Sequence, residues 1–244
     1  MMSRGRARIG VLVPFTNVNL EPDLALLAPE GVSLHFARLG GYDLDAIPDQ
    51  AQMEGLGAAD IAEPMRLIQG VRPNVVLYGC TSATLTHGPG FDRALAERIG
   101  GASDAVSITA AGALVDALRS LGARRVGFAS PYVASINDRA VEFLAGHGIE
   151  TVCRSDIGTE LGNYGQGELT PEEVFELGLK ADTKDADALV LSCTDMRSVE
   201  VVDRLEQATG KPVVCSNQAL MHMALEALGL RPSKPCGYLM RAAA

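Results

Sequence analysis

Two stretches of the sequence are near copies of each other: Val75-Val76-Leu77-Tyr78-Gly79-Cys80-Thr81-Ser82 and Ala188-Leu189-Val190-Leu191-Ser192-Cys193-Thr194-Asp195. In each, a short apolar run typical of a buried strand is followed by Gly or Ser, then by Cys-Thr and a polar turn. The carboxyl end of a parallel strand is where an α/β sheet places its chemistry. The repeat therefore predicts two thiols, Cys80 and Cys193, at equivalent places in a duplicated fold.

The duplication extends beyond the two cysteines. Residues 8–15 resemble residues 125–132, and residues 106–121 resemble residues 213–228. The separation between matching positions shortens only gradually along the chain, which indicates two copies of one set of βα units. Short strand patterns alternate with helical patterns almost throughout, and this alternation is typical of parallel sheets. We therefore predict an α/β fold of two pseudo-symmetric, doubly wound parallel-sheet lobes with the active site between them.

The composition narrows the class of protein. The chain has 244 residues, a net charge of −9, 47% hydrophobic residues and 21% charged residues, which is ordinary for a globular enzyme. The negative charge offers no basic surface for nucleic acid or anionic lipid. No run approaches the roughly 20 apolar residues of a membrane span, and the first residues lack a signal-peptide core. We expect a cytoplasmic enzyme with a small-molecule substrate and neither a nucleic acid nor a membrane as partner.

The cysteines and histidines do not form a ligand pattern. The five cysteines are scattered and include no C-x-x-C pair, and the four histidines show no spacing typical of a metal site. Neither of the common nucleotide-binding glycine motifs is present. We therefore expect no metal and no nucleotide cofactor. This leaves the repeated thiols as the best candidates for the chemistry.

The pair of Cys-Thr motifs, one in each lobe, resembles the aspartate/glutamate racemase superfamily. Within it, several segments are similar to the branch of maleate cis–trans isomerases and arylmalonate decarboxylases: Val13-Pro14-Phe15-Thr16-Asn17, Gly79-Cys80-Thr81-Ser82, Pro131-Tyr132, Gly162-Asn163 and Cys215-Ser216-Asn217-Gln218-Ala219. The decarboxylases of this branch have one catalytic cysteine, in the second lobe. Two cysteines therefore favour an isomerase or a racemase. The sequence departs from the family pattern at Phe15-Thr16 and after Cys193, where a different substrate choice could arise.

The resemblance also implies an architecture. It implies lobes that exchange segments, with 1–104 plus 212–244 around Cys80 and 105–211 around Cys193, and it implies a homodimer. Two glycine-rich loops, Gly40-Gly41 and 162–167, are candidates for lids over the cleft. The residues expected to bind the substrate, through backbone N–H groups or through side-chain donors, are Asn17, Thr81, Ser82, Tyr132, Asn163, Thr194 and Asp195.

For maleate, the resemblance implies that the Cys80 thiolate adds to an alkene carbon, while Cys193 supplies and removes the proton. Both thiols are expected at strand-to-helix turns, where the helix dipole lowers a thiol pKa. The same two thiols could act as acid and base at a Cα–H, which is racemisation. A malonate-type decarboxylase and a non-catalytic small-anion-binding protein are the further alternatives.

Overall fold

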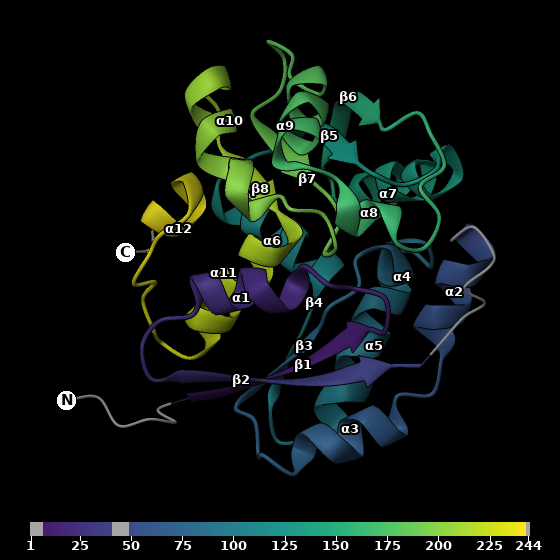
Figure 1. The fold of residues 1–244 in the computed structure, drawn as a ribbon, viewed down its shortest axis with the longest axis vertical. Helices are drawn as coiled ribbons and strands as arrows, with labels where there is room; N and C mark the ends of the chain where they lie inside the picture. The colour runs from purple at the N-terminus through teal and green to yellow at the C-terminus, as the bar shows by residue number, and fades with distance from the viewer. Residues whose placement is uncertain (1–6, 41–48, 243–244) are drawn as a thin grey trace.

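The computed structural model describes residues 7–40 and 49–242, and within these ranges it contains two four-stranded parallel sheets (Figure 1). The first sheet has the order β2-β1-β3-β4, from β1 (Ala7–Pro14), β2 (Val32–Leu39), β3 (Val75–Tyr78) and β4 (Val106–Thr109). The second has the order β6-β5-β7-β8, from β5 (Arg125–Ser130), β6 (Glu150–Asp156), β7 (Ala188–Leu191) and β8 (Val213–Cys215). The same strand order in both sheets confirms the predicted duplicated α/β fold.

The helices fill the connections between the strands. They are α1 (Leu20–Leu27), α2 (Gln50–Ala58), α3 (Ala62–Gln69), α4 (Ser82–Leu85), α5 (Pro89–Gly101), α6 (Ala110–Ser120), α7 (Ala134–Gly146), α8 (Gly165–Glu168), α9 (Pro171–Lys180), the 3₁₀ turn η1 (Val199–Val201), α10 (Val202–Thr209), α11 (Ser216–Ala227) and α12 (Gly237–Ala242). In the described part of the chain, none of them is long and apolar enough to cross a membrane.

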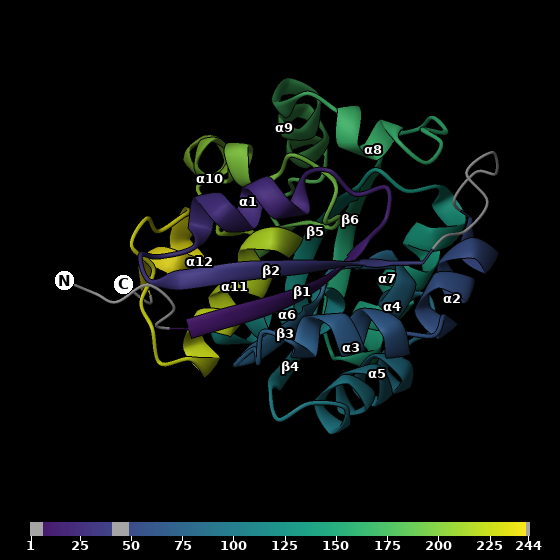
Figure 2. The same ribbon diagram turned by 60° about the horizontal axis from the view of Figure 1, so that its bottom comes forward.

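The two sheets meet through the helices that follow their last strands. α6 follows β4 and α11 follows β8, and the two helices pack against each other between the sheets (Figures 1 and 2). α11 also contacts α1, β3 and β4, so it covers the sheet opposite to the one it leaves. α6 contacts β4 and, in turn, β8 of the second sheet. The exchange between the lobes is therefore made by helices.

The strand pairing differs from the expected lobe boundaries at two strands. β4 pairs with β3 in the sheet of Cys80, although residues 105–211 were expected around Cys193. β8 pairs with β7 in the sheet of Cys193, although residues 212–244 were expected around Cys80. A parallel strand usually returns beside a sequential neighbour through a short helical crossover. Each sheet therefore completes its fourth strand before the chain crosses to the other lobe.

The inner strands are buried on both faces, which explains their nearly continuous apolar sequences. All four residues of β3 and all four of β7 are buried, and Tyr78 and Phe128 are the largest fully buried side chains. Interiors of this kind tolerate little added volume. Two interior strands thus carry the cysteine turns on a rigid base.

Gly127 in β5 shows how tight this packing is, because a Cβ there would lie 2.1 Å from the backbone oxygen of Ala181. We expect Gly127→Ala to lower the free energy of unfolding by about 1–3 kcal/mol through overpacking. Gly90→Ala, in α5, is the matched control, because nothing lies within 4 Å of its added Cβ. Denaturant unfolding of both variants measures the difference. Equal stability of the two would contradict the packing described for β5.

Candidate active site

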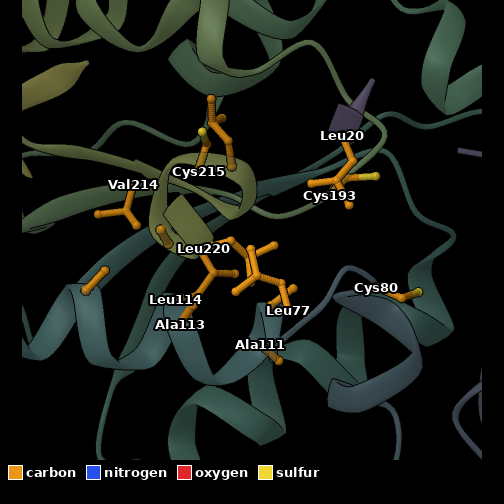
Figure 3. Close-up of a cluster of buried hydrophobic side chains, with 14 of the residues drawn as sticks. Leu20, Leu77, Cys80, Ala111, Ala113, Leu114, Cys193, Val214, Cys215 and Leu220 are labelled. Atoms are coloured by element: carbon orange, nitrogen blue, oxygen red, sulfur yellow. The ribbon is translucent and has the colours of Figure 1, made fainter. Parts of the chain in front are cut away.

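The two predicted thiols stand just past the carboxyl ends of β3 and β7, the equivalent inner strands of the two sheets. Both are free cysteines, and Cys80 is 5% and Cys193 4% exposed. Figure 3 shows them on separate segments, with both sulfurs directed to the same side of the view. They line one small cavity of about 50 Å³. The structure therefore brings the two repeated motifs together at a single site.

The cavity is polar on one part of its wall and apolar on another. The full lining comprises Pro14, Thr16, Asn17, Met53, Leu56, Cys80, Ser82, Tyr132, Ile136, Gln166, Cys193, Thr194 and Asp195. This set contains both thiols and five of the seven residues expected to bind the substrate. It contains neither Lys nor Arg, so a carboxylate in the cavity would depend on neutral donors. Among the described residues, no group of three or more His, Cys, Asp or Glu could hold a metal ion.

Two expected binding residues lie outside this lining. Thr81 is fully buried, and its hydroxyl donates a hydrogen bond to Ser216 Oγ at 3.0 Å. Asn163 is 5% exposed and lies in the turn before α8. The lid candidates are also only partly described, because Gly41 lies outside the described residues. From the second candidate loop, Gln166 on α8 contributes to the cavity wall.

A chain of hydrogen bonds connects the loop after β1 to both cysteine turns. Asn17 Nδ2 donates to Thr194 Oγ1 at 3.1 Å, and Thr194 Oγ1 donates to the backbone oxygen of Gly79 at 2.9 Å. Asn17 Oδ1 accepts from the backbone N–H of Leu20 at 2.9 Å. Buried groups paired in this way hold their positions, because breaking a bond leaves a polar atom unsatisfied. Asn17 and the Thr194 hydroxyl therefore fix the two turns relative to each other.

Residues in the first turn of α11 form hydrogen bonds with both cysteine turns. Ser216 accepts the hydrogen bond of Thr81, beside Cys80. Asn217 Nδ2 donates to the backbone oxygen of Thr194 at 3.0 Å, beside Cys193, and to Asp23 Oδ2 at 2.7 Å. The segment Cys215 to Ala219 was recognised only as a family motif. The structure shows that its polar residues connect the two halves of the site.

Asp23, the partner of Asn217, is a buried carboxyl whose pKa is raised to about 7, mainly by burial; the hydrogen bond from Asn217 partly offsets this. Because the folded state holds the proton more tightly, this contribution to stability is complete below the ordinary pKa of 3.8 and is lost as pH rises through about 7. We expect Asp23→Asn to be more stable than the parent at pH 8, by about 2 kcal/mol, and the gain to vanish near pH 4. Denaturant unfolding at both pH values tests this, with the exposed Asp116→Asn as control. A gain of equal size at both pH values would contradict the burial effect.

The environment of the thiols differs from the sequence expectation. Burial raises the pKa of Cys80 and raises that of Cys193 to about 12. The expected helix dipoles are weak, since α4 is four residues long and the first turn after Cys193, η1, begins only at Val199. Desolvation disfavours a charged thiolate more than these short elements favour it. The prediction of lowered thiol pKa values is therefore wrong for the structure as it stands.

The groups that oppose this desolvation differ between the two thiols. At Cys80, the backbone N–H of Ala83 and the Ser82 hydroxyl lower the pKa and so stabilise a thiolate. At Cys193, the charge of Asp195 raises the pKa further, while a hydrogen bond from Tyr132 lowers it. The N–H of Asp195, expected to face a substrate carboxylate, donates to Cys193 Sγ at 3.3 Å. The surroundings of Cys80 therefore stabilise a thiolate better than those of Cys193.

Fold and site together define a class of protein: a two-lobed α/β protein of duplicated architecture with one buried thiol from each lobe at a shared cavity. The family model described as arylmalonate decarboxylase matches residues 9–239. The chain therefore belongs to the arylmalonate decarboxylase family, and this confirms the predicted branch of the aspartate/glutamate racemase superfamily.

The similar proteins include both activities of that branch. A maleate isomerase of Nocardia farcinica is 31% identical, over 97% of this chain and 96% of its own. The arylmalonate decarboxylase of Bordetella bronchiseptica is 29% identical, over 85% and 82%. Among solved structures, a cysteine-to-alanine variant of a maleate isomerase from Pseudomonas putida S16, with maleate, has a TM-score of 0.88 at 26% identity, covering 97% of this chain and 98% of that one.

A second solved structure bears on the role of the thiols. It is a cysteine-to-serine variant of the Nocardia farcinica maleate cis–trans isomerase with a covalently bound succinylcysteine intermediate. Its TM-score is 0.87 at 26% identity, and it covers 98% of this chain and 99% of that one. The protein of known structure thus forms a covalent bond between a cysteine and the substrate carbon skeleton.

Proposed function

We propose that this protein is a cofactor-independent cis–trans isomerase that converts maleate, or a related cis-dicarboxylate, to fumarate through a covalent cysteine adduct. The observation that carries the proposal is the meeting of Cys80 and Cys193 at one small cavity. The similarity to maleate isomerases over nearly the whole chain supports it.

The first step is addition of the Cys80 thiolate to one alkene carbon. A carbon–sulfur bond forms, the π bond breaks, and its electron pair moves onto the neighbouring carbon and its carboxylate as an enediolate. Cys193 then gives its proton to that carbon, which leaves a succinyl adduct on Cys80 and a thiolate at Cys193. Covalent catalysis of this kind replaces one difficult rotation by two easier additions.

The second half reverses the sequence after rotation about the new carbon–carbon single bond. The Cys193 thiolate removes the proton, the double bond re-forms in the trans geometry, and the carbon–sulfur bond to Cys80 breaks. A neutral acid with a pKa of about 12 is a weak donor to bulk water, but a donor positioned beside the substrate carbon is effective. Tyr132, which hydrogen-bonds Cys193, stabilises the thiolate that forms between the two proton transfers.

The remaining polar residues of the lining hold the substrate carboxylates. Ser82 and Tyr132, which carry hydroxyl groups, and Gln166, which carries a side-chain amide, all line the cavity. Asn17 and Thr194 act mainly through each other, because their hydrogen bonds set the distance between the turns. Thr81 and Asn163 are proposed to act from behind the cavity wall, in the same supporting role.

The direct test is incubation with maleate in D₂O, followed by NMR. Fumarate formation that is lost in Cys80→Ala and in Cys193→Ala supports the isomerase. Deuterium at Cα of aspartate or glutamate without fumarate from maleate would instead identify a racemase. Release of carbon dioxide from a substituted malonate, again without fumarate, would identify a decarboxylase. Binding of these acids without any turnover would leave a small-anion-binding protein.

Two further expectations have different sources: the resemblance implies the homodimer, and the sequence itself predicts the cytoplasmic location. The homodimer and the cytoplasmic location stay predictions, and we expect size-exclusion chromatography with light scattering to give twice the mass of one chain. A single-chain mass would contradict the dimer and would leave the proposed chemistry unaffected.

A further inference from the structure

One residue that lines the cavity proposed to hold the substrate, Asp195, carries a buried carboxyl group. Asp195 is 8% exposed, lines the cavity with both thiols, and follows Cys193 by two residues. Because the lining contains neither Lys nor Arg, no cation in the wall neutralises it. Like charges in a poorly solvated cavity repel strongly. The position of Asp195 therefore bears on which charge form of a substrate can enter.

The side chain of Asp195 is held in place by neutral donors from the loop after β1. Its Oδ1 accepts from the backbone N–H groups of Val18 at 2.8 Å and Asn19 at 3.1 Å, and from Asn19 Nδ2 at 3.4 Å. Asn19 Nδ2 also donates to the backbone oxygen of Asp195 at 2.8 Å and to that of Gly167 at 3.0 Å. These contacts fix the carboxyl at the wall without bringing a positive charge to it.

Several charged and titratable groups in the described part of the chain interact electrostatically with Asp195. Arg38, on β2, is the cation that favours its ionised form, but its guanidinium group also pairs with Glu21 and donates to the backbone oxygen of Asn17 at 2.7 Å. On the other sides are the carboxyl of Asp23 on α1 and the thiols of Cys80 and Cys193, all of which the charge of Asp195 affects. Cys193 also accepts a hydrogen bond from Tyr132.

Resting on the proposed function, we propose that Asp195 sets the charge preference of the cavity: the ionised side chain disfavours each negative charge that enters, and so favours a cis-acid with one negative charge, such as a monoprotonated dicarboxylate or its monoamide, over a dianion. Burial raises the pKa of Asp195 to about 6, so the side chain changes charge near neutral pH. When protonated, it has an O–H group to offer to a carboxylate. When ionised, it accepts a hydrogen bond from an amide or carboxylic acid.

The charge of the cavity can be measured without turnover by alkylating its thiols with iodoacetate, which is anionic, and with iodoacetamide, which is neutral. Both reagents form a carbon–sulfur bond and release iodide, so the reactivity of the thiolate cancels in the ratio of their rates. Peptide mass spectrometry follows Cys80 and Cys193 separately, with a small free thiol in the same buffers as the reference. The ratio therefore reports the field that an anion meets inside the cavity.

We expect the iodoacetate-to-iodoacetamide ratio of the parent protein to fall by roughly tenfold between pH 5 and pH 8, as Asp195 ionises. In Asp195→Asn, which keeps an acceptor oxygen for the three donors, we expect a ratio that stays flat and high. Asp195→Ser provides a second neutral variant if the first does not fold. Asp23→Asn is the matched control, because Asp23 is also a buried carboxyl but does not line the cavity, and it should keep the parental fall.

An alkylation ratio that does not change with pH in the parent, or that falls equally in the neutral variants, would overturn the proposal.

A second experiment compares maleate with its monoamide as substrates at pH 8. We expect the parent to favour the monoamide, and Asp195→Asn to shift the ratio of kcat/KM values toward maleate by roughly tenfold. An unchanged ratio of kcat/KM would equally count against Asp195. If neither acid is isomerised but the alkylation ratio behaves as expected, the proposed function fails while the charge role of Asp195 stands.

Discussion

Cys80→Ser is expected to lower kcat/KM for maleate by at least about a thousandfold, because the covalent step requires a thiolate. A serine hydroxyl at the same position ionises far less readily than a thiol. The N–H of Ala83 and the hydroxyl of Ser82, which stabilise the Cys80 thiolate, would therefore have no anion to stabilise. The fold should be preserved, since one oxygen replaces one sulfur in a turn whose backbone bonds are unchanged.

Fumarate formation followed by NMR measures this loss, and circular dichroism confirms the fold. Cys153→Ser is the matched control, because this cysteine is only half-buried, lies on β6, and does not line the cavity. We expect the control to keep the parental rate. More than a tenth of the parental kcat/KM in Cys80→Ser would mean that the reaction does not pass through an adduct at this thiol.

Cys193→Ser is expected to lower kcat by about 10²–10⁴-fold, the usual contribution of a positioned general acid and base. The nucleophile is intact in this variant, so binding and addition continue, while delivery and removal of the proton become slow. The defect should therefore appear in kcat and far less in KM.

Steady-state kinetics on maleate and solvent deuterium exchange into the substrate carbon measure this separation. In the parent, exchange and isomerisation should occur together; in Cys193→Ser, both should slow together. Unchanged kcat in Cys193→Ser would contradict the role of this thiol. If Cys80→Ser and Cys193→Ser instead change kcat and KM by the same factors, the two thiols would act as the symmetrical acid–base pair of a racemase.

The fold was predictable because inner parallel strands have a distinct sequence signature. β3 and β7 are buried on both faces, so they appear as continuous apolar runs, and their repetition placed Cys80 and Cys193 correctly at the ends of equivalent strands. The partner of an outer strand is not encoded in this way. β4 and β8 are three or four residues long, and hydrophobic pattern alone does not decide which sheet each of them joins.

The site was predictable where a polar or reactive side chain stood out from its surroundings. Met53, Leu56 and Ile136 also line the cavity, but as apolar residues on α2 and α7 they have the pattern of any helix facing a core. The expected turn after Cys193 identified Asp195 through its backbone N–H, yet not that this N–H donates to Cys193 Sγ while the side chain accepts from the loop after β1. The acidity of the thiols was mispredicted because burial, which dominates it, depends on the packed structure.

The most direct test of the two-thiol account is the covalent adduct itself. Cys193→Ser protein is mixed with maleate, quenched in acid, and analysed by intact mass and then by peptide mapping. We expect an added mass equal to one substrate molecule, located on Cys80 and absent from Cys80→Ser protein. An adduct on another residue, or fumarate formed by the parent with no adduct at any time in the variant, would contradict nucleophilic addition by Cys80.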